Sequence, residues 1–297
     1  MVRIKPVVAL ILASFACTQG VHATENGTDT IGEGAEGFFA GALPPQGLYG
    51  LAYYSHYEAN RFNDADGHAA IPGFHLDANV LIGRVVYMSG QTFLGGRVGA
   101  YAVLPVEIVS LDAAGAAFNH TGIGDAAVAP LLLAWGAGSL RTAGALEISV
   151  PTGQYDPNSA LNLGHNYYSF RPVFTVTWLP TSALEFSGKV TYTFNTSNPA
   201  TDYHSGQLFH IDYSASYAVT PKLRVGVNGY YVQQTTDDRQ DGQSVDGDGF
   251  RGRVIGVGPA VRYQFAKCSV EARWVKEFEV RNRPDGNALW IKAEFAF

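Results

Sequence analysis

Apolar and polar residues alternate along most of the chain from residue 48 onward. In residues 184–194, for example, Leu, Phe, Gly, Val and Tyr fill every second position, and Glu, Ser, Lys and Thr fall between them. A period of two is that of a β-strand with one apolar and one polar face. The pattern predicts strands over residues 48–58, 74–89, 91–109, 122–136, 139–150, 166–179, 184–194, 207–219, 222–234, 251–265, 268–280 and 289–297.

The connections between these strands alternate in length. Tight turns are expected at residues 89–90, 137–138, 180–182, 220–221 and 266–267. Longer polar stretches occupy residues 59–73, 110–121, 151–165, 195–206, 235–250 and 281–287. A soluble sandwich has no reason to sort its connections in this way, whereas a membrane barrel has short periplasmic turns and longer extracellular loops. The sequence therefore predicts an all-β fold, a transmembrane antiparallel up-and-down β-barrel of about twelve strands.

The last strand ends the chain on an aromatic residue. Phe295 and Phe297 belong to its apolar face, and Lys292 and Glu294 lie between the apolar positions. An exposed terminal Phe is uncommon in a soluble protein. The alternative interpretation of these residues is the last edge strand of a soluble β protein. The ending resembles the final strand of bacterial outer-membrane barrels, which the assembly machinery reads. We expect this strand to close the barrel against residues 48–58, with both phenylalanines toward lipid.

The N-terminus predicts export. Arg3 and Lys5 precede an apolar run over residues 7–16, and small residues lead up to a cleavage position after Ala23, so residues 1–23 are expected to be a signal peptide. Lipoprotein processing at Cys17 is the competing interpretation. Residues 24–47 are Gly-rich and aperiodic. They are expected to form a periplasmic segment or one tucked into the barrel mouth, or else a poorly ordered terminus, followed by the transmembrane barrel over residues 48–297.

Composition agrees with a barrel in the bacterial outer membrane. Charged residues make up 15% of the chain, against roughly 25% in ordinary soluble domains. The chain also contains 34 Gly, 16 Tyr and 17 Phe, and after residue 23 it has no apolar run of the roughly 18 residues that a membrane helix needs. Only Cys268 remains after export, so no intramolecular disulfide is expected. The net charge of -6 without a basic patch gives no indication of nucleic-acid binding.

The polar face of each strand is expected to line the lumen, because Arg or Lys on the lipid face near the midplane costs about 2–4 kcal/mol. These side chains either form a salt-bridge network that fills the barrel or line a conduit and set its selectivity. Their mixed signs predict little preference for cations or anions. About twelve strands also enclose less room than an open porin of 16–18 strands, so a narrow passage is expected. The predicted lumenal set is Asp77, Glu147, Arg171, Glu185, Lys189, His210, Asp212, Arg224, Arg262, Glu271, Arg273, Lys292 and Glu294.

Several longer motifs carry a family resemblance. They are PTGQYDPNSALNLGHN from residue 151, NTSNPATDYHSG from residue 195, GIGD from residue 122, PPQGLY from residue 44, YYVQQTTDD from residue 230 and GVGPAVRYQF from residue 256. Together they resemble the outer-membrane family named for the meta-pathway of phenol degradation, including its SphA-type branch, which is grouped with FadL-like channels for hydrophobic molecules. The resemblance covers nearly the whole exported chain. It implies a β-barrel in the outer membrane, often associated with uptake of aromatic or lipid-like compounds.

Catalytic and metal sites are weakly indicated. His204 and Ser205 adjoin near a predicted extracellular rim, but adjacency does not make a nucleophile–base pair, and no orienting Asn or Asp accompanies them. The acidic residues of loop 235–250 are a candidate Ca²⁺ site, although the loop lacks the DxDxDG register. The His residues show no metal-ligand spacing. We therefore expect no enzymatic activity, no metal and no cofactor.

The leading functional hypothesis is a channel for uptake of small hydrophobic, aromatic or lipid-like molecules across the outer membrane. The passage would run through the lumen or through a lateral gap in the wall. The alternatives are a closed structural or surface-interaction barrel and, third, a barrel hydrolase that uses Ser205. Expected partners are outer-membrane lipid and lipopolysaccharide, the barrel assembly machinery and a small hydrophobic ligand.

Replacing Phe297 with Asp tests the role of the terminus. We expect a lower yield of assembled barrel with little change in activity per assembled molecule, because the side chain belongs to the assembly signal. Heat-modifiable gel migration measures the assembled fraction. Normal insertion with reduced transport would contradict this interpretation.

Overall fold

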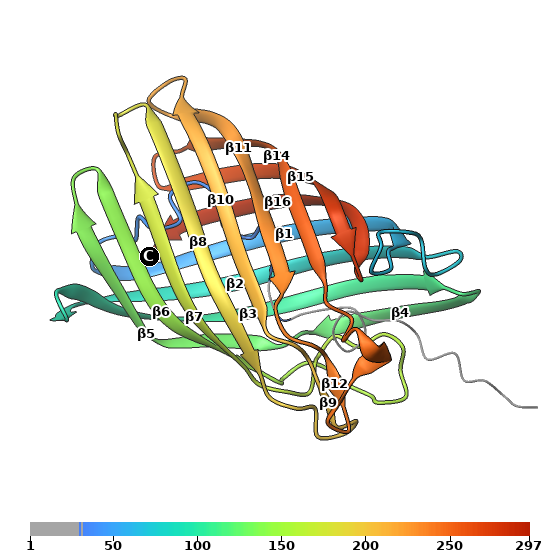
Figure 1. Ribbon diagram of the computed structural model, residues 1–297. Coiled ribbons are helices and arrows are strands. Elements are labelled where there is room, and N and C mark those ends of the chain that lie inside the picture. The colour runs from blue at the N-terminus through green and yellow to red at the C-terminus, as the bar shows by residue number, and fades with distance from the viewer. Residues whose placement is uncertain (1–29, 31) are drawn as a thin grey trace, which may run out of the picture.

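The computed structural model describes residue 30 and residues 32–297, and its strands wind into a closed antiparallel barrel (Figure 1). The predicted signal peptide lies outside the described residues. The barrel strands are β1 (Gly47–Phe62), β2 (His75–Phe93), β3 (Gly96–Ala113), β4 (Ala116–Ile123), β5 (Ala126–Ala137), β6 (Leu140–Val150), β7 (Ser169–Trp178), β8 (Leu184–Asn195), β10 (Leu208–Ala218), β11 (Leu223–Gln234), β14 (Arg253–Gln264), β15 (Cys268–Arg281) and β16 (Pro284–Ala296).

The barrel has twelve spans, because β4 and β5 both pair with β3 and together make one of them. It closes where β1 pairs with β16, with Tyr53 opposite Lys292 and Tyr49 opposite Ala296. The expected fold class and the closing role of the last strand are therefore confirmed. No helix in the described part of the chain is both long and apolar enough to cross a membrane.

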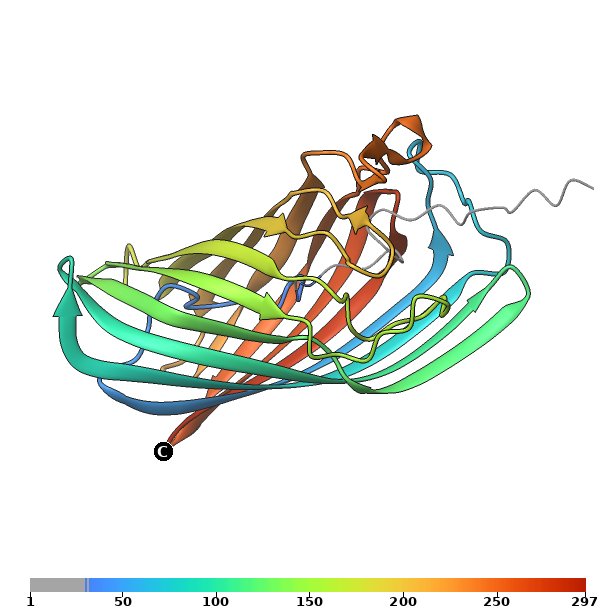
Figure 2. The same cartoon turned by 90° about the horizontal axis from the view of Figure 1, so that it is seen from below.

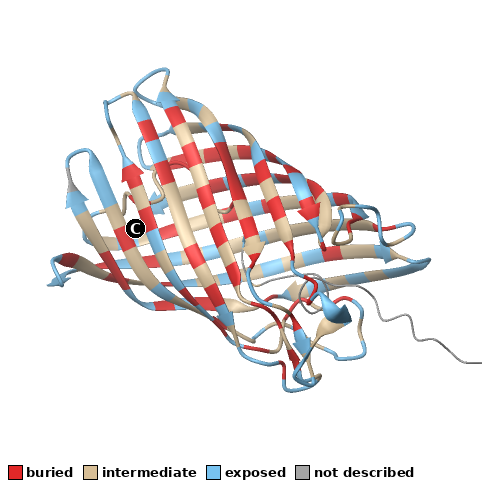
Figure 3. Ribbon diagram, in the orientation of Figure 1, coloured by how far each residue is buried: buried red, intermediate tan, exposed pale blue. Residues whose placement is uncertain are grey.

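Burial alternates residue by residue along the strands, which gives the barrel the banded appearance of Figure 3. On β8, for example, Glu185 is fully buried while its neighbour Phe186 is 41% exposed. The exposed aromatic and aliphatic side chains form the outer surface, where they meet lipid, and the buried polar ones point into the barrel. Every backbone N–H and C=O at membrane depth needs a partner, and a closed ladder of strands supplies it.

Three expected connections are wrong in the structure. The loop expected at residues 281–287 is reduced to Asn282 and Arg283, because β15 continues to Arg281 and β16 begins at Pro284. The turn between β2 and β3 lies at Leu94-Gly95 and not at residues 89–90, because β2 continues through a register shift after Met88. Residues 110–121, expected to be a loop, continue β3 and form β4, with Ala114-Gly115 as the turn. Both turns place two residues at left-handed φ angles, 49° and 73° in the first and 51° and 85° in the second. This geometry suits the twist of a hairpin.

The wall is interrupted between β4 and β5. On the periplasmic side of the interruption β5 pairs with β6, beginning at Ala126 opposite Val150. On the extracellular side β4 pairs with β3 alone, and the other edge of β4 has no backbone partner among the described residues. The β3–β4 hairpin projects past the neighbouring strands (Figure 2). We call the point at Gly124-Asp125 the wall break.

A small cap covers one part of the extracellular end. The strands β9 (Tyr203–His204), β12 (Arg239–Gln240) and β13 (Gln243–Ser244) pair into a separate sheet, followed by the short 3₁₀ turn η2 (Val245–Gly247). The buried carboxylate of Asp238 connects the two loops that form the cap. It accepts hydrogen bonds from the Tyr203 hydroxyl at 2.6 Å, the Gly206 backbone N–H at 2.6 Å and the Gln234 side-chain amide at 2.7 Å.

The cap is expected to open more readily as pH rises. Burial raises the pKa of Asp238 from its ordinary 3.8 to about 7, although the hydrogen bonds that it accepts act in the opposite direction. Below pH 3.8 the carboxyl is protonated in both the closed and the opened cap. Between pH 3.8 and about pH 7 the Asp238 carboxyl ionises only in the opened cap, so the closed cap loses stability as pH rises. Above about pH 7 the carboxyl is ionised in both forms and the loss levels off.

Hydrogen exchange of the cap amides, corrected for the intrinsic pH dependence, measures this opening. Asp238→Asn should remove the dependence, because the amide cannot ionise yet keeps the carbonyl oxygen as an acceptor. Asp246→Asn, at an exposed position of the same loop, should keep it. A cap whose opening in the unsubstituted protein does not vary with pH would contradict the assignment.

Candidate functional site

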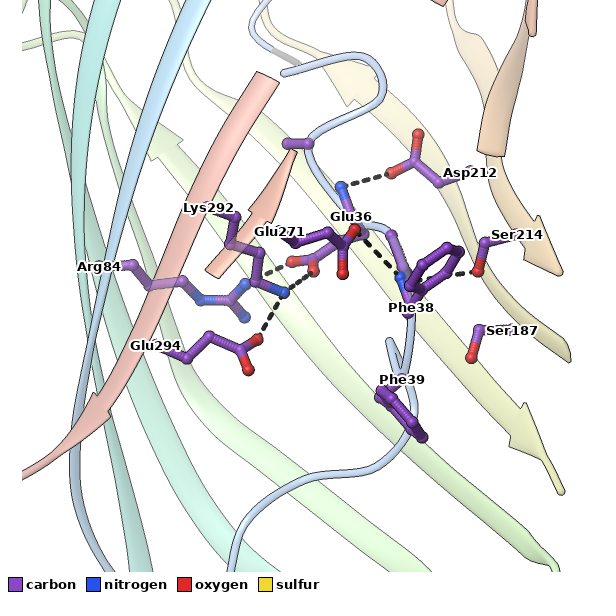
Figure 4. Close-up of polar contacts among 12 residues, drawn as sticks. Glu36, Phe38, Phe39, Arg84, Ser187, Asp212, Ser214, Glu271, Lys292 and Glu294 are labelled. Atoms are coloured by element: carbon purple, nitrogen blue, oxygen red, sulfur yellow. Dashed lines mark hydrogen bonds and ion pairs between the residues drawn. The ribbon is translucent and has the colours of Figure 1, made fainter. Parts of the chain in front are cut away.

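The chain before β1 runs through the lumen without regular structure. We call residues 32–46 the lumenal segment. Its backbone N–H groups donate to carboxylates of the wall, namely Gly34 to Asp212 at 2.9 Å and Phe39 to Glu185 at 2.9 Å. Phe38 donates to Glu271 at 3.3 Å (Figure 4). Irregular backbone is tolerated at membrane depth only where protein or a cavity surrounds it, and these carboxylates supply the partners that the segment cannot provide for itself.

The wall also supplies donors to the segment's carbonyl groups and fits its glycines closely. Arg273 donates to the Ala35 carbonyl at 2.8 Å, and the Ser214 hydroxyl donates to the Gly37 carbonyl at 3.2 Å. A Cβ atom at Gly41 would lie 2.6 Å from the backbone nitrogen of Thr177. Only glycine permits so close an approach of two backbones.

Glu36 of the lumenal segment sits in a chain of alternating charges. Its carboxylate lies 2.7 Å from Arg84 of β2 and 3.2 Å from Lys292 of β16. Lys292 in turn lies 2.8 Å from Glu294, which lies 2.9 Å from Arg262 of β14. We call this series, Arg84–Glu36–Lys292–Glu294–Arg262, the ion chain, and Figure 4 shows four of its members. Buried charges need such partners, because desolvation is otherwise costly.

The lumen has two chemically different walls. From β7 round to β16 the inward side chains are mainly charged or hydroxyl-bearing, and the lumenal segment bonds to this side. From β2 to β5 they are mainly aliphatic. The inward residues of this apolar wall are Leu76, Ala78, Val80, Ile82, Val86, Val103, Pro105, Val109, Ala127 and Leu132. The segment therefore fills the polar side and leaves most of the apolar side open, apart from the place where Leu43 packs against the cluster that contains Val86 and Leu132.

Two chambers lie along the apolar wall. The extracellular chamber, of about 370 Å³, is lined by Val80, Val103 and the loop residues Leu161 and Leu163. The periplasmic chamber, of about 340 Å³, reaches the β14–β15 turn and is lined by Val86 and Leu132. Glu36, Arg84 and Lys189 line both chambers, so the chambers meet at these three charged side chains. Each volume falls in the range of pockets for small molecules.

The loop from residue 151 to residue 168 covers the wall break from within. Asp125 accepts the backbone N–H groups of Gly153 at 2.9 Å and His165 at 2.8 Å, and its carboxylate lies 3.0 Å from His165 Nδ1. Leu161 and Leu163 pack on Val109 of β3 in a small buried cluster. A single carboxylate thus holds both ends of this loop at the point where the ladder of strands is interrupted.

The structure places most of the predicted lumenal set on the inward face. Glu185, Asp212, Glu271, Arg171 and Arg273 bond to residue 30 or to the lumenal segment. The rest of the set divides among four surroundings. Arg262, Lys292 and Glu294 belong to the ion chain. Glu147 pairs with Arg171, and His210 pairs with Asp212. Arg224 lies 5.0 Å from the Phe39 ring, and Lys189 lies between the chambers. A role in selectivity stays a prediction.

The lumenal assignment of Asp77 is wrong. Leu76 and Ala78 line the extracellular chamber, so Asp77 between them faces outward, where it bonds to Asn79 at 2.6 Å. Both faces of β2 are apolar along most of its length. The difference in polarity that identifies the lumenal face of other strands is therefore missing on β2. With 19 residues, β2 is also longer than the roughly 9–11 residues of a membrane span. Its extracellular end can therefore carry polar side chains on the outside.

Other lumenal residues were missed in the sequence. Arg84 shares a face with Ile82 and Val86, and the apolar character of both faces of β2 hid it. Glu36 lies in a stretch without periodicity, where only the repeated glycines indicated close packing. Glu277, buried on β15, accepts the hydroxyls of Tyr230 at 2.6 Å and Tyr57 at 2.7 Å. Glu277 lies an even number of residues from Glu271 and Arg273 on β15, so the alternation of the strand places it on the same inward face.

The weaker alternatives gain no support from the geometry. His204 Nδ1 lies 3.3 Å from the Ser197 hydroxyl, whereas the Ser205 hydroxyl is buried with no hydrogen-bond partner in residues 30 and 32–297. The two side chains therefore do not form a nucleophile–base pair. In the acidic loop, Asp237 bonds to Ser244 and Arg251. No group of three His, Cys, Asp or Glu in the described chain is arranged to hold a metal ion.

Residues 59–293 match the family described as "Putative MetA-pathway of phenol degradation". The chain belongs to this family. The match spans most of the barrel, from the end of β1 into β16. The family resemblance seen in the loop motifs is therefore confirmed. No curated protein matches the sequence.

Solved structures show the same fold. The COG4313 outer membrane channel from Pseudomonas putida F1 superimposes with a TM-score of 0.78 at 19% identity, over 87% of this chain and 98% of that one. The translocator domain of the autotransporter NalP from Neisseria meningitidis gives 0.50 at 10% identity, over 86% and 91%. At these identities the likeness concerns the fold alone. It agrees with an outer-membrane barrel.

Replacing Glu36 with Gln should loosen the lumenal segment. Arg84 and Lys292 would each lose a charged partner, and breaking a buried ion pair costs about 3–5 kcal/mol. We expect larger or more frequent openings in single-channel recordings from planar bilayers. Glu58→Gln, at an exposed outward position on β1, is the matched control and should behave as the unsubstituted protein. Equal conductance in all three proteins would show that Glu36 does not hold the segment in place.

Proposed function

We propose that the protein is an outer-membrane channel for the passive uptake of small hydrophobic molecules, aromatic or lipid-like. The observation that carries the proposal is the position of the open space. Both chambers lie against the aliphatic side chains of β2, β3 and β5, while the lumenal segment occupies the charged side. A conduit for sugars or ions would instead leave its polar wall free.

The wall break offers such molecules a lateral entrance. A hydrophobic solute concentrates in the membrane, and at the break β4 has no backbone partner on its outer edge within the described residues. Behind that edge lie Leu161 and Leu163, which also line the extracellular chamber. A solute that displaces the loop there passes from lipid onto the apolar wall.

A closed structural barrel is the second candidate, and the ion chain favours it. The chain bridges β2, the lumenal segment, β16 and β14 across the lumen. Conductance distinguishes the two candidates. A closed barrel gives no openings in a planar bilayer and no change when a hydrophobic solute is added, whereas a channel responds to the solute.

The apolar wall is tested by adding hydroxyl groups to it. The double variant Val80→Thr with Val103→Thr keeps the shape of both side chains but puts two hydroxyls into the extracellular chamber. Burying a hydroxyl without a partner costs about 0.5–2 kcal/mol on octanol scales. Two of them should slow uptake by roughly tenfold. The entry of N-phenyl-1-naphthylamine, a neutral dye that fluoresces in phospholipid, into intact cells measures the rate.

Val85→Thr with Val106→Thr is the control, since it makes the same change at outward positions of the same two strands. These valines are 49% and 41% exposed. Uptake through the control should match that of the unsubstituted protein once the amounts of barrel are equal. Cells that take up the dye equally fast with and without the protein would refute the channel itself. Equal slowing in both double variants would refute the role of the apolar wall.

A further inference from the structure

The periplasmic chamber carries an excess of positive charge. Five cationic side chains line it, Arg84, Lys189, Arg262, Lys267 and Lys292, against the two carboxylates of Glu36 and Glu294. The extracellular chamber has no such excess, because six carboxylates and four cationic side chains line it. A solute that moves inward therefore passes from a surface rich in carboxylates to one rich in ammonium and guanidinium groups.

The ion chain accounts for part of this charge. Glu36 is shared between Arg84 and Lys292, and Glu294 between Lys292 and Arg262. These two carboxylates are thus already engaged by three cations. Lys189 and Lys267 remain outside the chain. Lys267 lies in the exposed turn at the periplasmic rim, whereas Lys189 lies deep, where the two chambers meet.

Lys189 has no partner of its own. It is half-buried on the inward face of β8, and its ammonium group makes no hydrogen bond or ion pair within the residues that the structure describes. The nearby carboxylates belong to other cations, Glu36 to Arg84 at 2.7 Å and Glu147 to Arg171 at 2.9 Å. A half-buried ammonium group to which no carboxylate is hydrogen-bonded is favoured by an anion placed beside it.

Apolar surface faces this ammonium across the open space. Val86 and Leu132 line the periplasmic chamber, and Ile82 and Val103 line the extracellular one. A molecule in either chamber can therefore place an apolar body on the β2–β5 side and one negative group at Lys189. An anion without an apolar body would leave that wall bare, and a neutral hydrophobic molecule would leave the ammonium without a partner.

We propose that Lys189 binds the carboxylate of a small amphipathic monocarboxylate whose apolar part lies on the wall of β2, β3 and β5. This rests on the proposed uptake of hydrophobic molecules and narrows their class. Lys189 sets the preference for an acid over its neutral analogue, and the aliphatic wall sets the preference for an amphipathic acid over a simple anion.

The test compares 4-fluorobenzoate with 4-fluorobenzamide, which have nearly the same shape and differ in charge. The full-length protein is placed in nanodiscs of zwitterionic lipid, and ¹⁹F line broadening gives the dissociation constant of each probe, with empty nanodiscs as the blank. We expect the benzoate to bind about tenfold more tightly than the benzamide. Lys189→Met should abolish the difference by weakening the benzoate alone, and Lys189→Arg should restore it.

Lys276→Met makes the same substitution at an exposed outward position on β15 and should change neither constant. Equal weakening of both probes in Lys189→Met would overturn the proposal, since Lys189 would then act only on the shape of the lumen. Acetate that competes as well as benzoate would overturn the amphipathic class and leave a simple counter-ion site. If neither probe binds the unsubstituted protein, the proposed uptake fails together with this inference, whereas benzamide binding without any preference for benzoate refutes the inference alone.

Discussion

An irregular stretch of backbone inside a membrane barrel must find partners for its N–H groups, and in this protein wall carboxylates provide them. Glu185 on β8, Asp212 on β10 and Glu271 on β15 each accept from the lumenal segment. This requirement decides which side of the lumen the segment occupies. It also decides, by exclusion, that the remaining space lies against the aliphatic side chains of β2, β3 and β5. The division between a filled polar side and an open apolar side thus begins with these hydrogen bonds.

The ion chain adds a second reason why the segment belongs to the barrel. Glu36 is a part of the segment, yet both of its partners, Arg84 and Lys292, come from the wall. Without the segment Lys292 would keep only Glu294, and Arg84 would lose the ion pair that it makes with Glu36. The wall is thus electrostatically incomplete until the segment is in place, because buried like charges without a counter-charge are strongly unfavourable. The segment acts as a structural complement of the wall rather than as an inert obstruction.

Sequence patterns predicted the strands well and the lumen unevenly, for physical reasons. Period-two alternation identifies a strand wherever one face is apolar and the other polar, as on β8 and β10. On β2 both faces are largely apolar, so Asp77 was assigned to the wrong side and Arg84 was missed. The lumenal segment has no period at all. Its bonds reach 146 residues along the chain to Glu185 and 233 to Glu271, and no local pattern encodes such contacts. The β3–β4 hairpin was missed because its turn, Ala114-Gly115, lacks the Asn or Asp that usually marks one.

The position of the lumenal segment in the chain has a consequence for the order of assembly. The segment comes before β1 and so leaves the ribosome ahead of every strand, but its acceptors lie on β8, β10 and β15. It therefore cannot dock until the strands that are made last have been laid into the wall. Closing β16 against β1 and seating Glu36 beside Lys292 involve the same strand, so the final seam and the interior of the barrel are completed together.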